Sequence, residues 1–185
     1  MLRLTIIDIE MDDIVKQAMA KWPDVPDCYG WLGLDMRGHW YLRDAATQVC
    51  GDFPNAKGQR LEHAGLLAFL GRNYQPDAQG RWYFQNGPQR VFVELQVAPW
   101  VLRVDSRGGV ETHTGLAVAP QQCLQDEQGW VYLAGAYGLG LVHGMDMVHV
   151  AEQLEQGRWI VADAHSTELA ERFGFVRSPK LANGE

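Results

Sequence analysis

Two apolar spacings occur along this chain of 185 residues. In the segment 90–97, valine and leucine fall at every second position, which is the period of a half-buried antiparallel strand. In the segment 11–21, apolar residues form one stripe at helical spacing, and the prolines that follow end the helix. Three further helices are predicted, at 61–73, 146–156 and 166–173.

A polar turn with a glycine, followed by aromatic and β-branched residues, recurs in the sequence. Asp35-Met-Arg-Gly-His-Trp-Tyr-Leu42 is repeated as Asp77-Ala-Gln-Gly-Arg-Trp-Tyr-Phe84, and looser copies begin at Asp126 and Glu155. Glycine adopts the positive φ that tight hairpin turns need, so each copy predicts a turn followed by a strand. The copies are too unevenly spaced for a solenoid or a propeller.

Further hairpin signals complete the fold prediction. Asn86-Gly87 separates two strand-like segments, and a strand at 100–104 is followed by a turn at 106–109 and a return strand at 110–118. The fold class predicted is α+β, with β-rich antiparallel sheets and about four short helices.

The domain organisation predicted is simple. Residues 11–175 are expected to form a single domain and 176–185 a flexible tail. Residues 1–10 are either a short strand or an upstream extension, because Met11 is a plausible alternative start.

Composition narrows the functional classes. The chain is 46% hydrophobic and 21% charged, as globular proteins are, and its net charge of −7 argues against nucleic-acid binding. It has no long apolar run and no recognisable leader, so a cytoplasmic protein without a membrane partner is expected. Three widely spaced cysteines argue against a disulfide framework or a zinc ribbon.

Two motifs suggest a bound cofactor or metal, and in each the residues are better explained by a role in stabilising the fold. The glycines between Gly135 and Gly144 do not have the GxGxxG spacing of a dinucleotide site, so turns and strand glycines are favoured and no cofactor is predicted. His143-x-x-Asp146-x-x-His149 would spread three ligands around a helix, so a cap and a packed histidine are favoured and no metal is predicted.

Two groups of side chains remain as candidate sites. Donors near one hairpin could bind an anionic ligand, with aromatic residues beside them: Gln85, Gln89, Arg90, Trp82 and Trp100. A polar cluster could form if separate elements converge: His113, His143, Asp146 and His149.

Several short segments resemble an uncharacterised proteobacterial family, a domain of unknown function of similar length. They are 22–26, 29–32, 80–90, 98–100 and 140–143, and the most specific is Gly-Arg-Trp-Tyr-Phe-Gln-Asn-Gly-Pro-Gln-Arg at 80–90. The resemblance covers about 22–175. It implies a bacterial cytoplasmic domain and brings no assigned activity.

The excess of aromatic residues and single arginines, without a coherent catalytic set, is typical of interfaces. The leading hypothesis is a non-enzymatic binding or assembly protein, expected to be a homo-oligomer, with a small molecule or a protein as possible partner. The alternatives are a small-molecule sensor, or an enzyme whose site is assembled from Arg90, His113, His143 and Asp146.

Overall fold

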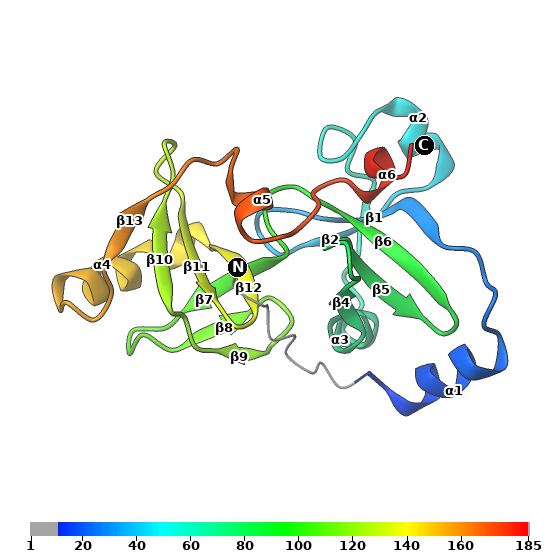
Figure 1. Ribbon diagram of the computed structural model, residues 1–185, viewed down its shortest axis with the longest axis horizontal. Helices are drawn as coiled ribbons and strands as arrows, with labels where there is room; N and C mark the ends of the chain where they lie inside the picture. Colours follow the sequence, from blue (N-terminus) through cyan, green and yellow to red (C-terminus); the bar gives the residue numbers. More distant parts are fainter. Residues whose placement is uncertain (1–10, 185) are drawn as a thin grey trace. The chain divides into compact units, whose positions relative to one another are not determined.

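The computed structural model describes residues 11–184, which form two compact units (Figure 1). Unit 1 comprises Ala98–Phe173 and the short segment Met36–Gly38, and unit 2 comprises 11–35, His39–Val97 and 174–184. Each unit is built on one sheet with its own helices, so the class is α+β and rich in strands. None of the helices in this described part is long and apolar enough to cross a membrane.

Unit 2 contains a six-stranded sheet in the order β3-β2-β1-β6-β5-β4. Its central pair, β1 and β6, is parallel, and the other pairs are antiparallel. The elements of unit 2 are α1 (Asp13–Lys21), β1 (Cys28–Leu34), β2 (Trp40–Leu42), α2 (Ala45–Cys50), β3 (Gln59–Arg60), α3 (Ala64–Arg72), β4 (Tyr74–Pro76), β5 (Trp82–Asn86), β6 (Gln89–Leu95) and α6 (Pro179–Ala182).

Unit 1 contains a seven-stranded sheet in the order β13-β10-β11-β12-β7-β8-β9. Two of its pairs, β12 with β7 and β10 with β13, are parallel, so both sheets are mixed rather than purely antiparallel. The elements of unit 1 are β7 (Trp100–Val104), β8 (Val110–Thr112), β9 (Ala117–Val118), β10 (Gln122–Gln125), β11 (Val131–Gly135), β12 (Gly138–Val142), the 3-10 helix η1 (Gly144–Asp146), α4 (Met147–Glu155), β13 (Val161–Asp163) and α5 (Leu169–Arg172).

One turn, with the pattern Asp-x-x-Gly, connects strands at four places. It begins at Asp35, Asp77, Asp105 and Asp126, and in each copy the aspartate N–H donates to the carbonyl of the residue four positions later. The same carboxylate accepts the N–H of that later residue. Asp77, Asp105 and Asp126 also accept the N–H of the residue two positions on. The glycines all have φ between +77° and +83°, which only glycine adopts without strain.

This turn makes each strand connection self-contained. The carboxylate satisfies N–H groups that the tight turn leaves without a strand partner, and the register of the paired strands follows from it. In two copies the second carboxylate oxygen also accepts a tyrosine hydroxyl six residues on, from Tyr41 to Asp35 and from Tyr132 to Asp126. Sequence analysis identified three of the four turns but placed the turn before β8 at 106–109, one residue late.

A buried arginine organises the long connection that follows β2. Arg43 is 1% exposed and donates to the carbonyl oxygens of Ala56, Gly51 and Gly30 at 2.6–2.9 Å. Because the guanidinium carries five donors in a fixed plane, it can bind several carbonyls at once where a lysine could not. The segment containing α2, which sequence analysis did not predict as a helix, is held to β1 in this way.

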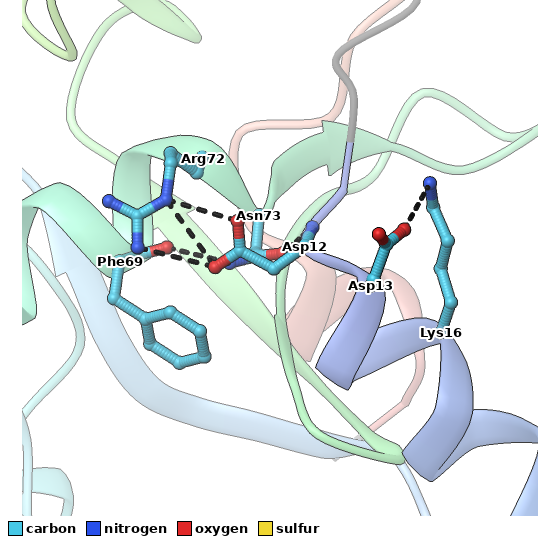
Figure 2. A network of polar contacts seen from close by, with 6 residues as sticks. All are labelled: Asp12, Asp13, Lys16, Phe69, Arg72 and Asn73. Atoms are coloured by element: carbon cyan, nitrogen blue, oxygen red, sulfur yellow. Dashed lines mark hydrogen bonds and ion pairs between the residues drawn. The ribbon is translucent and has the colours of Figure 1, made fainter.

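The first helix is attached to α3 through polar contacts (Figure 2). Arg72 donates from Nε and Nη2 to the carboxylate of Asp12, the residue before α1. Asn73 accepts the Asp12 N–H and donates to the Phe69 carbonyl. The helix predicted at 11–21 is confirmed as α1, but of its apolar stripe only Val15 is buried, whereas Ile14 and Met19 are 72% and 37% exposed.

Other predicted elements are confirmed with changed bounds. The helices predicted at 61–73 and 146–156 are α3 and η1 with α4, whereas the helix at 166–173 is reduced to the four residues of α5. In the hairpin between β5 and β6, Asn86 pairs with Gln89, so the two-residue turn is Gly87-Pro88 rather than Asn86-Gly87. A positive φ at Gly87 followed by proline fits a type II′ turn.

Three segments differ from expectation or lie outside the structure. The copy that begins at Glu155 is not a hairpin, because Gly157 ends α4 with its N–H on the Leu154 carbonyl. Residues 176–184, expected as a flexible tail, contain α6, and Arg177 accepts the Leu95 N–H. The strand or extension considered for 1–10 lies outside the described residues, and the single domain remains a prediction.

The Asp-x-x-Gly turns can be tested by comparing two of them. Asp126 is buried and accepts two N–H groups and the Tyr132 hydroxyl, whereas Asp105 is exposed and accepts two N–H groups. We expect Asp126→Ala to lower the free energy of unfolding by about 2–4 kcal/mol, because buried donors lose their acceptor. Asp105→Ala should lower the free energy of unfolding by clearly less, since water can replace its exposed carboxylate as the acceptor. Urea denaturation measures both, and equal losses would contradict the role assigned to burial.

Candidate functional site

An arginine–aromatic surface lies on one face of the unit 2 sheet. It is formed by Tyr29, Arg81, Tyr83 and Arg90, which cover the fully buried ring of Phe92. The rings of Tyr29 and Phe92 stack in parallel with centroids 4.7 Å apart. The guanidinium of Arg81 lies 4.7 Å from the Phe92 ring centre, and that of Arg90 lies 5.7 Å from Tyr83 and 5.5 Å from Phe92. Tyr83 and Phe92 are opposite each other on β5 and β6, which fixes their shared face.

A neighbouring carboxylate holds each arginine of this surface. Arg90 makes two hydrogen bonds to Asp27, at 2.9 and 2.8 Å, while 39% of its side chain stays exposed. Arg81 donates from Nε to Asp77, the aspartate of the second Asp-x-x-Gly turn. Burial raises the pKa of Tyr29 and of Tyr83, so both hydroxyls remain neutral donors at physiological pH. The surface is therefore ordered, and its charges are balanced.

The structure separates the predicted ligand-binding residues. Gln85 pairs with Arg90 across β5 and β6, but it is 1% exposed and donates to the Gly87 carbonyl. Gln89 donates to the carbonyl of Pro26. Trp82 is buried against Tyr74 on the other face of the sheet, and Trp100 is buried in unit 1 with its indole N–H on the Tyr137 carbonyl. Gln89 and Arg90 thus remain partly exposed in this group.

Unit 1 brings two members of the predicted polar cluster into one groove. Asp146 and His149 line a hollow of about 620 Å³ together with Arg103, Asp105 and Glu111. Arg103 makes two hydrogen bonds to Asp146, which also accepts the Val104 N–H. These contacts, the Arg103 hydrogen bond above all, lower the pKa of Asp146 despite its burial. The groove therefore has a fixed ion pair as part of its lining.

The remaining histidines of the cluster have local structural partners. His143 Nδ1 accepts the Met145 N–H at the start of η1, which is the cap predicted for this motif, although on His143 rather than Asp146. His113 Nδ1 accepts the Val101 N–H, and its ring lies 5.8 Å from Trp100. His149 Nδ1 lies 3.3 Å from Glu152. Within residues 11–184, no three histidine, cysteine or acidic side chains are placed to hold a metal ion.

The glycine run 135–144 forms part of a hairpin rather than a phosphate-binding loop. β11 pairs directly with β12, and Gly138 has a φ of +94° in the turn between them. A Cβ on Gly140 would lie 2.5 Å from Leu102 of the neighbouring strand, so close packing excludes any side chain there. Turns and strand packing account for these glycines.

The sequence did not indicate Arg103 of unit 1 as a site residue, nor four residues of unit 2: Tyr29, Arg81, Tyr83 and Phe92. Arg103 interrupts the apolar strand 100–104, and its carboxylate partner Asp146 lies more than forty residues away in sequence. No local spacing connects the two. The only available signal was a charged residue inside a buried strand, which indicates a partner without identifying it.

Comparison with known proteins identifies the family of this chain but assigns it no activity. The family described as "Protein of unknown function (DUF2946)" matches residues 11–180, and the chain belongs to it. No match was found among curated proteins. A solved structure of a DUF1285 family protein from Silicibacter pomeroyi DSS-3 is similar, with a TM-score of 0.47 and 14% identity over 69% of this chain and 70% of that one.

The ion pair of the groove predicts how stability depends on pH. In the folded state the pKa of Asp146 is lowered, so its carboxylate stabilises the fold above the unfolded pKa of about 4, and this contribution is lost as the pH falls through the lower folded value. At pH 7 we expect Asp146→Asn to be less stable than the wild type by about 1–2 kcal/mol. Urea denaturation at about pH 7 and pH 3 should show this difference shrinking, while the exposed control Glu62→Gln changes little at either pH. A difference that does not depend on pH would contradict the assignment.

Proposed function

We propose that this protein is a non-enzymatic binding protein that self-assembles through the arginine–aromatic surface of unit 2. The observation that carries the proposal is the pair of partly exposed arginines, each held over aromatic rings by its own aspartate. Arginine and tyrosine are the residue types that most often dominate binding energy at protein interfaces. Their fixed geometry lowers the conformational entropy that association would cost.

The charge pattern of this surface favours a second copy of the chain as the partner. Two Arg–Asp pairs, Arg81 with Asp77 and Arg90 with Asp27, place positive and negative groups on the same face. A balanced surface does not attract a strongly charged partner. A two-fold axis, however, can bring the arginine of one copy opposite the aspartate of the other, as isologous interfaces do.

Self-assembly is tested by measuring mass in solution. We expect light scattering behind size-exclusion chromatography to give a molar mass above 20.8 kDa that rises with concentration. Arg90→Ala should weaken the association by about thirtyfold, which corresponds to the loss of a typical interface anchor. Arg60→Ala, a half-exposed arginine elsewhere in unit 2, is the matched control and should leave the mass unchanged. A wild-type protein that stays monomeric up to about 100 µM would refute the proposal.

The groove of unit 1 favours a second candidate function, that of a small-molecule sensor or an enzyme. Of the four residues considered for such a site, Asp146 lines this groove. His113 and His143 lie elsewhere in unit 1, and Arg90 belongs to unit 2. The volume of the groove is that of an ordinary ligand pocket, and Arg103 with Asp146 gives it a fixed pair of charges.

Native mass spectrometry of untagged protein purified from its own host distinguishes this second candidate from the first. For a sensor or an enzyme we expect excess mass on a stoichiometric fraction of the chains, and Asp146→Asn should abolish it. An oligomer of defined subunit number whose mass contains no bound ligand would instead favour self-assembly.

A further inference from the structure

A second, smaller hollow lies in unit 1 between the edge of the sheet and the chain after α4. This Trp159 pocket has a volume of about 240 Å³, and its lining includes Gln122, Cys123, Leu133, Arg158, Trp159 and Ile160. Leu133 and Cys123 face each other across β10 and β11, and both are buried, so the bottom of the pocket is apolar. Ile160 is 85% exposed and adds apolar surface to the lining.

The wall of the pocket is held in place by hydrogen bonds. The N–H groups of Arg158 and Trp159 both donate to the Gln153 carbonyl at the end of α4. β13 then pairs with β10, with Val161 opposite Cys123. Since both ends of the segment 158–160 are anchored, the pocket is formed before any ligand arrives.

The charge of the pocket is positive although the chain carries a net charge of −7. Arg158 is the one charged residue in the described lining. It donates from Nη1 to Gln153 Oε1 at 3.0 Å, a neutral acceptor, so its charge is not balanced by that contact. An anionic group beside Arg158 would meet guanidinium donors suited to a carboxylate.

We propose that the Trp159 pocket binds a small carboxylate with an apolar body. The apolar part lies against Trp159 and Ile160, and the carboxylate accepts hydrogen bonds from Arg158 at the rim. The volume limits the ligand to a small ring or a short chain. This site is separate from the arginine–aromatic surface and does not depend on self-assembly.

The experiment is an NMR titration of the ¹⁵N-labelled full chain with three small molecules that have similar shapes and different charges. We expect phenylacetate to shift the amide signals of residues 120–123, 133 and 158–160 with a dissociation constant in the range of about 0.1–1 mM. Its neutral and cationic analogues, phenylacetamide and phenethylamine, should bind at least about tenfold more weakly, because they lack the charge that Arg158 recognises. Absence of saturable shifts up to about 10 mM phenylacetate, or shifts confined to other residues, would overturn the proposal.

Variants separate the site from the fold. Arg158→Gln should weaken phenylacetate binding by about tenfold or more, and Arg158→Lys should restore part of it. Arg60→Gln in unit 2 is the control and should bind as the wild type does. Because Arg158 is exposed, its variants are expected to keep the dispersed spectrum of the folded protein. Equal affinity in Arg158→Gln and the wild type would refute the assignment.

Discussion

The satisfaction of backbone N–H groups in tight turns is the constraint on which both units depend. At Asp35, Asp77, Asp105 and Asp126 a carboxylate accepts turn N–H groups, and a glycine three residues later adopts positive φ. Each turn sets the register of the two strands that it connects, so the pairing of β1 with β2, β4 with β5, β7 with β8 and β10 with β11 follows from local chemistry. The same carboxylates then position other groups: Asp77 holds Arg81, and Asp126 holds Tyr132.

Long-range polar contacts in unit 2 have a different role, because they join segments that the turns leave independent. Arg43 binds three carbonyls around α2, and Glu94 accepts a hydrogen bond from the Ser178 hydroxyl and one from the Lys180 N–H at α6. Burial raises the pKa of Glu94, and these donors partly oppose that rise. The end of the chain is thus an integral part of unit 2, since a buried acceptor binds it.

The candidate sites differ in how their charges are used. On the arginine–aromatic surface and in the groove of unit 1, every arginine described is bound to a carboxylate, which suits interfaces whose charges are fixed and balanced. In the Trp159 pocket, Arg158 is bound to a neutral amide and its charge is not balanced by that contact. The same residue type therefore supports association in one place and anion recognition in another, and the neighbour of each guanidinium decides which.

The sequence by itself determined the α+β class, the main helices and three of the four Asp-x-x-Gly turns, because these depend on spacing and on residues within a few positions of one another. It also indicated Arg90 as an accessible donor. Only the tertiary structure decided that Trp82 and Trp100 are core residues, that Arg103 pairs with Asp146, and that residues 176–184 bind unit 2. These outcomes depend on which distant segment supplies a partner, and the pattern along a single chain does not specify the distant partner of a polar or aromatic side chain.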